Sequence, residues 1–157
     1  ASDQKNLSDY SDKNITNMAS KKVAVVVSEW NEEVTESLYQ GALDTLLQHG
    51  VKKENIIRKN VPGSFELTLA AQWMAAENNI DAVICLGCVI QGETRHFDFI
   101  CDAVANGITN VAIKYNKPVI FGVLTTQNQK QALDRSGGKH GNKGDEAAIT
   151  AVKMLGF

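Results

Sequence analysis

Residues 82–98 read AVICLGCVIQGETRHFD, an apolar run followed by a segment with varied polar chemistry. The run Ala82–Leu86 has the length and aliphatic content of a strand that is covered on both faces. The segment Gly87–Asp98 then brings together glycines, an acid, a hydroxyl, an arginine and a histidine. A buried strand followed by such a loop is typical of a parallel sheet with a binding site at the carboxyl ends of its strands.

Outward from this segment, the chain repeats a unit of one strand followed by one helix. Four apolar or β-branched segments are expected to form strands: 22–28, 55–61, 82–86 and 118–123. Helical spacing predicts helices over 32–49, 129–135 and 146–155, and a glycine-rich loop is expected at 136–144. Ser64 is expected to cap another helix. A further helix is predicted from the stripe of Phe99, Ala103, Gly107 and Val111. This alternation predicts an α/β fold, a three-layer sandwich whose four-stranded parallel sheet is doubly wound and flavodoxin-like.

The first 20 residues differ from the rest of the chain. They are rich in Asp, Asn, Ser and Lys and have only scattered apolar positions. This composition is typical of a flexible arm, or of an arm that becomes ordered on a neighbouring subunit. We therefore predict a flexible N-terminal arm over 1–20 and one folded domain over 21–157.

The charge and hydropathy of the chain exclude several classes of partner. The formal net charge is −2 and like charges do not cluster, which argues against nucleic acid. The apolar runs are shorter than the roughly 18 residues that a membrane span requires, and the N-terminus has no apolar signal segment. We therefore expect a cytoplasmic protein that binds neither nucleic acid nor a membrane.

Three cysteines, an odd number, argue against a disulfide framework and suit a reducing compartment. Cys85 and Cys88 form a C-x-x-C pair, but a thioredoxin-like pair lies at the start of a helix, and Cys85 lies in a predicted strand. Cys101 and His96 could complete a zinc site, but the usual spacing of a second ligand pair is absent. Buried free thiols are the favoured interpretation, and no metal site is predicted.

The segments that follow the predicted strands contain most of the chemically distinctive residues. They are 29–31 (Glu-Trp-Asn), 62–66 (Pro-Gly-Ser-Phe-Glu), 87–98 and 122–125 (Gly-Val-Leu-Thr). Because the carboxyl ends of parallel strands meet at one edge, these segments are expected to surround one site. Within it, Trp30 is either core packing or a platform for a flat ring. Glu66 either interacts with a helix dipole or accepts hydrogen bonds from a polyol.

Other residues offer groups for anions and protons. The turn Gln91–Thr94 lies before a helix and presents backbone N–H groups and a hydroxyl, which suit a phosphate or a carboxylate. Arg135 and Lys143 either add charged hydrogen bonds or are solvated at the surface. Imidazole titrates near neutrality, so His96 is the best general acid or base among the three histidines, with a capping role as the alternative.

Four segments together resemble the lumazine synthase family of riboflavin biosynthesis: VPGSFEL (61–67), GCVIQGETRHFD (87–98), FGVLT (121–125) and GNKG (141–144). The match runs in order over residues 22–155. The resemblance implies a transferase that condenses 5-amino-6-(D-ribitylamino)uracil with 3,4-dihydroxy-2-butanone 4-phosphate. The products would be 6,7-dimethyl-8-ribityllumazine, phosphate and water, and neither a cofactor nor a metal would be used.

The resemblance also implies roles for single residues. His96 would be the proton shuttle. Residues for the pyrimidine and ribityl groups would be Trp30, Asn31, Ser64, Phe65, Glu66, Val89, Ile90 and Phe121. Residues for the phosphate would be Glu93, Thr94, Arg135 and Lys143.

Two positions depart from the usual family pattern. Trp30 stands where phenylalanine is common and offers a wider platform, which keeps open a non-catalytic flavin-binding or storage protein of the same fold. Gln91 stands where a basic residue is frequent, which weakens the field around a phosphate. The third alternative, a receiver-type signalling domain, requires clustered acids at the strand ends, and Glu29 alone does not provide them.

The resemblance further implies a homo-oligomer, a pentamer whose active sites lie between subunits, with Phe121 from one subunit and the other loops from the next. Some members of the family close twelve pentamers into an icosahedral capsid of sixty subunits. The loop over 136–144 has no insertion of the kind expected in members that remain pentamers, which favours the shell. Riboflavin synthase is a candidate partner.

Overall fold

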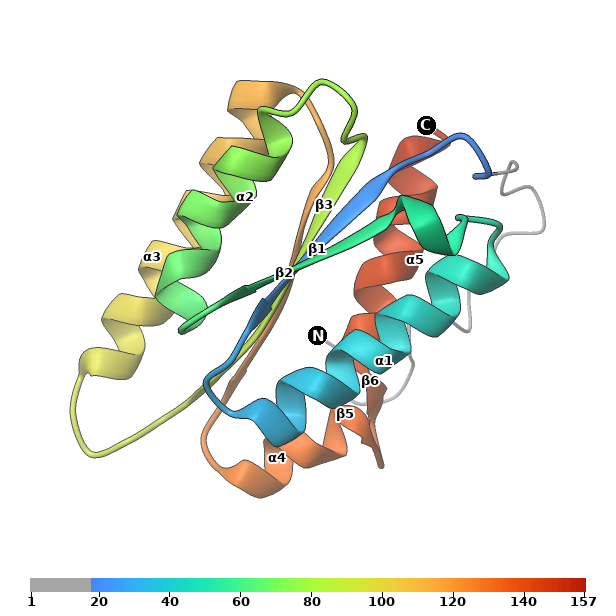
Figure 1. Ribbon diagram of the computed structural model, residues 1–157. Helices are drawn as coiled ribbons and strands as arrows, with labels where there is room; N and C mark the ends of the chain where they lie inside the picture. Colours follow the sequence, from blue (N-terminus) through green and yellow to red (C-terminus); the bar gives the residue numbers. More distant parts are fainter. Residues whose placement is uncertain (1–17) are drawn as a thin grey trace.

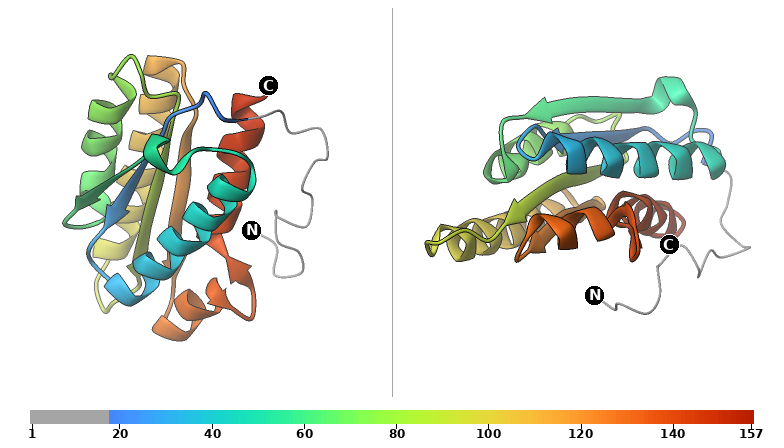
Figure 2. Two further views of the ribbon diagram at one scale, coloured as in Figure 1. Left: turned by 45° about the vertical axis from the view of Figure 1, so that its right-hand side comes forward. Right: turned by 90° about the horizontal axis from the view of Figure 1, so that it is seen from below.

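Four parallel strands form the centre of the structure, a computed structural model that describes residues 18–157. The strands are β1 (Val23–Ser28), β2 (Ile56–Val61), β3 (Ala82–Ile90) and β4 (Val119–Thr126), in the order β2-β1-β3-β4. Figure 1 shows α2 (Leu67–Ala75) and α3 (His96–Tyr115) on one face, with α1 (Glu32–Gln48) and α5 (Lys143–Leu155) on the other. The left view of Figure 2 shows the same three layers. The predicted doubly wound α/β sandwich is confirmed.

An apolar core lies on each face of the sheet. Ile84 and Leu86 of β3 belong to the core beneath α1 and α5, whereas Val83 and Cys85 belong to the core beneath α2 and α3. Because successive side chains of a strand point to opposite faces, a strand covered on both sides is apolar at every position. The unbroken apolar run of residues 82–86 follows from this double covering.

Strands β3 and β4 are longer than the sequence predicts. They pair with each other from Val83 and Val119 as far as Ile90 and Thr126, so residues 87–90 belong to a strand and the loop begins at Gln91. On the other side of the sheet, a short 3-10 helix (Lys53–Asn55) precedes β2. The extra pairing carries the ends of β3 and β4 beyond the helices that cover the sheet, towards the predicted site.

Two expectations about helices are wrong. The predicted stripe of α3 is right at Val111 but wrong at Phe99 and Ala103, which face solvent, because Val104 and Ile108 are the buried residues of the preceding turns. Ser64 does not cap α2, because a 3-10 turn (Ser64–Glu66) comes first and its hydroxyl has no partner. By contrast, the core positions predicted for α1, such as Leu38, are buried.

The described residues begin inside the predicted N-terminal arm. Met18 is buried among the core residues beneath α1 and α5, although the arm was expected to extend to residue 20. The remaining part of the predicted arm, residues 1–17, lies outside the described residues. Between residues 18 and 157, no helix has both the length and the apolar character needed to cross a membrane.

The glycine-rich segment before α5 forms a small hairpin. After the short helix α4 (Gln129–Asp134), strands β5 (Ser136–Gly138) and β6 (Gly141–Asn142) pair antiparallel. Gly137 and Gly141 have φ angles of 113° and 82°, which glycine adopts without strain. The segment predicted as a loop is therefore a hairpin, which lies beside α4 in Figure 1.

Helices α1 and α5 approach each other most closely at Gly144, in the first turn of α5. A Cβ atom at this position would overlap the backbone carbonyl group of Leu38 in α1. Neither backbone can rotate away, as a long side chain could. Glycine at position 144 is therefore a requirement of the helix packing.

Replacement of Gly144 by alanine is expected to lower the free energy of unfolding by about 2 kcal/mol or more, because the new methyl group overpacks against backbone. Denaturant unfolding at one protein concentration measures the change. Gly92→Ala is the matched control, since nothing lies within 4 Å of the Cβ position there. Equal unfolding midpoints for the two variants would contradict the close contact.

Candidate active site

A pocket of about 770 Å³ lies beside the carboxyl ends of β1, β2 and β3. Its lining comes from the end of β3, from the segments that follow the three strands and from the first turns of α3: Trp30, Asn31, Gly63, Ser64, Phe65, Glu66, Cys88, Val89, Ile90, Gly92, Thr94, His96, Phe97, Phe99 and Ile100. We call it the ring pocket. Its volume is within the range that holds a small organic ligand. A pocket thus lies at the sheet edge where the sequence predicts a site, and three of the four predicted segments line it, whereas residues 122–125 do not.

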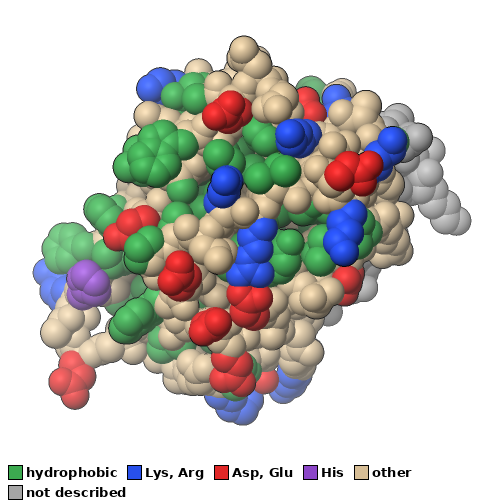
Figure 3. All heavy atoms as spheres, viewed as in Figure 1, with side chains coloured by type: hydrophobic (Ala, Val, Ile, Leu, Met, Phe, Trp, Pro, Cys, Tyr) green, Lys and Arg blue, Asp and Glu red, His purple; other side chains and the backbone are tan. Residues whose placement is uncertain are grey.

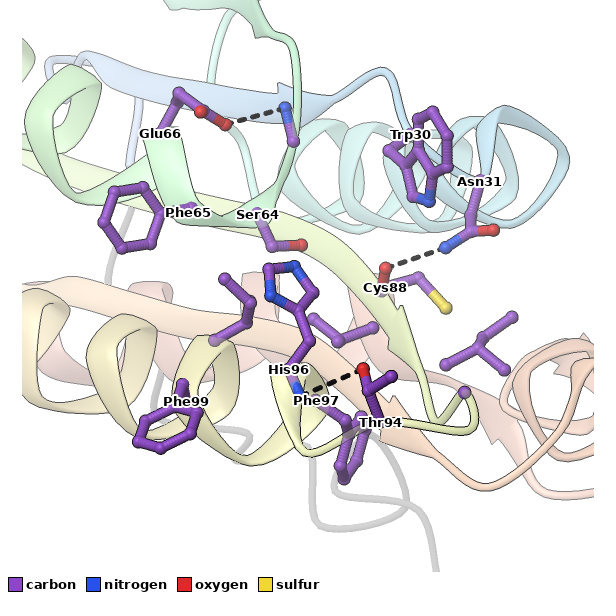
Figure 4. A pocket seen from close by; sticks show the side chains of 15 residues that line it. Trp30, Asn31, Ser64, Phe65, Glu66, Cys88, Thr94, His96, Phe97 and Phe99 are labelled. Atoms are coloured by element: carbon purple, nitrogen blue, oxygen red, sulfur yellow. Dashed lines mark hydrogen bonds between the residues drawn. The ribbon is translucent and has the colours of Figure 1, made fainter.

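Trp30 lies at the rim of the ring pocket rather than in the core. Its side chain is 73% exposed, so the core-packing interpretation is wrong. The next residue, Asn31, adopts a left-handed backbone conformation with φ of 63°, which asparagine tolerates better than most residues. Its amide nitrogen donates a hydrogen bond of 2.9 Å to the carbonyl oxygen of Cys88. This bond ties the end of β1 to β3 and holds Trp30 beside the cavity (Figure 4).

The segment after β2 places an acid, a hydroxyl and an aromatic ring on the same pocket. One carboxylate oxygen of Glu66 accepts a hydrogen bond of 3.0 Å from the backbone N–H of Gly63. The Ser64 side chain is buried, and its hydroxyl has no partner among the described residues. A buried hydroxyl without a partner costs about 1–3 kcal/mol, so a bound polyol would relieve this cost. Phe65 is exposed at the rim.

His96 is the first residue of α3, and Figure 4 shows its ring pointing into the cavity towards Ser64. The backbone N–H of His96 lies 3.4 Å from the Thr94 hydroxyl, which also lines the pocket. Glu93 is exposed and does not line the pocket. Of the predicted proton and phosphate groups, the ring pocket therefore collects His96 and Thr94.

A second pocket, of about 410 Å³, lies beside the edge strand β4. Its lining includes Phe121 of β4, Arg135, Lys143 and His140. We call it the cation pocket. The backbone N–H of Lys143 donates to the carbonyl oxygen of Arg135 at 2.8 Å, which keeps the two cationic residues together. The ammonium group of Lys143 lies 3.7 Å from the Glu146 carboxylate.

The predicted site residues are thus divided between two pockets of the chain. Phe121, Arg135 and Lys143 line the cation pocket and none of them lines the ring pocket, which contains His96 and Thr94. Within one chain, the four residues predicted for the phosphate are not brought together. This division fits the expectation that Phe121 serves the site of a neighbouring subunit.

Sequence reasoning missed several lining residues. Phe97 and Phe99 line the ring pocket, although Phe99 was predicted only as part of a helical stripe. Their place inside the motif-rich segment and its first helical turn was the available signal. His140 lines the cation pocket, and its position between Arg135 and Lys143 in the sequence was the corresponding signal.

The three cysteines are free, and the C-x-x-C pair cannot act as a redox pair in this structure. Cys85 faces the core beneath α2 and α3, whereas Cys88 faces the core beneath α1 and α5. Burial raises the pKa of the Cys85 thiol to about 12 and that of the Cys88 thiol to about 11. Among the described residues, no cluster of His, Cys, Asp and Glu could hold a metal ion.

Fold and site together define a doubly wound α/β protein with a pocket lined by aromatic and polar residues at the carboxyl ends of its strands. The model of the 6,7-dimethyl-8-ribityllumazine synthase family matches residues 20–157. A 6,7-dimethyl-8-ribityllumazine synthase of Cytophaga hutchinsonii is 68% identical over 155 residues, which cover 99% of this chain and 97% of the relative. A protein of the same name from Parabacteroides distasonis is 51% identical, and the alignment covers 97% of this chain and 95% of the relative. Another from Porphyromonas gingivalis is 52% identical, and the alignment covers 97% of this chain and 94% of the relative. The chain belongs to the 6,7-dimethyl-8-ribityllumazine synthase family.

The raised thiol pKa values predict low reactivity of Cys85 and Cys88 in the native protein. At pH 8 an aromatic disulfide reagent is expected to modify at most the partly exposed Cys101. All three thiols should react after unfolding, because the thiolate is the nucleophile and burial no longer suppresses it. Reaction of Cys85 or Cys88 in the native protein as fast as Cys101 would contradict the buried placement.

Proposed function

We propose that the chain condenses 5-amino-6-(D-ribitylamino)uracil with 3,4-dihydroxy-2-butanone 4-phosphate to 6,7-dimethyl-8-ribityllumazine, releasing phosphate and water. Membership of the family supports this reaction. The observation that carries it is the ring pocket, where Trp30, Ser64 and His96 surround one cavity. The same membership argues against a signalling receiver and against a non-catalytic flavin carrier.

The reaction requires the proton transfers and positioning that the ring pocket can supply. A primary amine adds to a ketone, water leaves as an imine forms, phosphate is eliminated and a second ring closes. Protons move at each step, and His96 is placed to carry them. Holding two substrates in register contributes much of the rest of the acceleration.

In this proposal, the pyrimidine stacks on Trp30, and the backbone near Val89 and Ile90 contacts the polar edge of the ring. The groups that bind the ribityl chain are Asn31, Ser64, Phe65 and Glu66. The unpaired Ser64 hydroxyl and the second carboxylate oxygen of Glu66 support polyol binding.

The complete active site in this proposal combines the ring pocket of one subunit with the cation pocket of its neighbour. Phe121 of the neighbour then covers the bound rings, while its Arg135 and Lys143 join Thr94 and Glu93 around the phosphate. The division of these residues between two pockets of one chain supports this arrangement. It requires a homo-oligomer, which we propose is a pentamer that can close into a sixty-subunit shell.

An exposed apolar surface on α2 and α3 also supports assembly. Large hydrophobic side chains are exposed there: Leu69, Trp73, Phe99 and Ile113. In Figure 3, hydrophobic side chains gather on the side where Figure 1 places these two helices, whereas acidic and basic side chains are mixed elsewhere on this face. Apolar surface of this kind is typical of a subunit interface.

We also propose a cytoplasmic location, with riboflavin synthase as a partner. The three free thiols support a reducing compartment. The partner takes up the lumazine that the proposed reaction produces.

His96→Ala is expected to lower kcat by about 10²-fold while leaving the unfolding midpoint unchanged, because the exposed imidazole transfers protons and does not pack in the core. Absorbance and green fluorescence of the lumazine follow the reaction. His49→Ala is the matched control, since His49 lies at the end of α1 away from both pockets. Wild-type turnover in His96→Ala would remove this residue from its role. If the wild-type protein forms lumazine no faster than the uncatalysed background but binds riboflavin, the protein is a flavin carrier and not this enzyme.

Arg135→Ala is expected to raise the KM for the butanone phosphate about tenfold or more, through the loss of a charged hydrogen bond. Co-expression of Arg135→Ala with His96→Ala tests the shared site. In a mixed ring, about a quarter of the sites combine an intact His96 with an intact Arg135 of the neighbour, and these sites regain activity at butanone phosphate concentrations well below the KM of Arg135→Ala. No recovery above the two separate variants would show that one chain supplies both residues.

A further inference from the structure

The side-chain amide of Asn142 joins three segments of the chain. Its nitrogen donates a hydrogen bond of 3.0 Å to the carbonyl oxygen of Ser37 in α1. Its oxygen accepts hydrogen bonds from the backbone N–H groups of Gly144 at 2.8 Å and Asp145 at 3.3 Å, at the start of α5. An amide can donate from its nitrogen and accept at its oxygen at the same time, whereas a carboxylate only accepts.

Helix α1 has a glycine at the point where this amide lies. A Cβ atom on Gly41 would come within 2.6–2.7 Å of three atoms of the Asn142 amide group. A Cβ atom does not lie that close to another heavy atom, so any larger residue at position 41 would push the amide away. Gly41 and Asn142 therefore form one contact, which we call the amide contact.

Asn142 is the last residue of the β5–β6 hairpin, and the amide contact ties this end of the hairpin to α1. Strands β5 and β6 pair over a few residues with an irregular register, and Gly137 and Gly141 lie in left-handed conformations. Asn142 is followed directly by Lys143, whose backbone N–H bonds to the carbonyl oxygen of Arg135. A shift of Asn142 would therefore move both cationic residues of the cation pocket.

We propose that Asn142 is a positioning residue for phosphate binding: through the amide contact with α1 it holds Arg135 and Lys143 where they meet the phosphate of the substrate. This proposal rests on the function proposed above. The amide contacts neither pocket's ligand itself; Asn142 lines neither the ring pocket nor the cation pocket. Its effect is on the two cations, and the pyrimidine end of the site lies outside its reach.

The first variant, Asn142→Ser, removes the bond to Ser37 and retains an oxygen that can cap α5. It also adds no charge beside the cation pocket. The KM for the butanone phosphate and the dissociation constant for inorganic phosphate are both expected to rise about tenfold, the effect of losing one hydrogen bond that orders charged groups. The KM for the pyrimidine substrate should stay within about twofold of the wild type.

The second variant, Gly41→Ala, breaks the same contact from the other side. Alanine favours a helix over glycine, so α1 itself is not weakened. A tenfold loss of phosphate affinity is again expected, now without the loss of a polar group. Gln40→Ala is the matched control, because Gln40 lies one position earlier on α1 and bonds only to the exposed Asp44.

Phosphate titration by calorimetry is the readout that does not depend on turnover. Wild-type phosphate affinity in both variants would overturn the proposal. An equal rise in the KM values of both substrates would also overturn it, because such a rise indicates general loosening of the structure. A wild-type protein that binds no phosphate would overturn it as well. A wild type that binds phosphate but forms no lumazine would contradict the proposed function alone, and the titrations of the variants would still test the amide contact.

Discussion

The burial of β1 and β3 between two helix layers is the constraint on which the rest of the structure depends. These strands occupy the middle of the sheet and are apolar on both faces. Their side chains build both cores, so the helices on each side must present apolar surfaces and must be joined to the strands by crossover connections. The connections then leave the carboxyl ends of the strands together at one edge.

The polar chemistry of the chain lies where this arrangement leaves room for it. The segments after β1, β2 and β3 surround the ring pocket, and the bond from Asn31 to the Cys88 carbonyl oxygen joins two of them. The cation pocket lies beyond β4 on the edge of the sheet, and its cations are held by the hairpin and by the amide contact with α1. Helix α1 thus begins at the ring pocket, and further along it contacts Asn142 beside the cation pocket. The two pockets are therefore linked through α1 within each chain.

Much of this could be predicted from the sequence, because hydrophobic periodicity and strand-end motifs are local signals. The predictions for single residues that were wrong failed because tertiary packing decided the position of those residues. Ser64 has the chemistry of a helix cap, but the chain turns through a 3-10 segment before α2 and leaves the hydroxyl facing the pocket. Phe99 has the hydrophobicity of a core residue, but α3 is rotated so that Val104 and Ile108 are buried instead. Neither the turn nor the rotation has a signature in the spacing of residues.

By itself, the sequence determined the alternation of strands and helices, the parallel sheet and the polar and aromatic residues that follow each strand. These features depend on the pattern of apolar residues along the chain and on the type of residue at each position, and both can be read from the sequence. Only the tertiary structure decided that Trp30 is exposed at a rim, that Cys85 and Cys88 face opposite cores, and that His96 and Arg135 lie in different pockets. Such facts depend on how strands and helices pack in three dimensions. The distance between two side chains far apart in the sequence is a property of that packing.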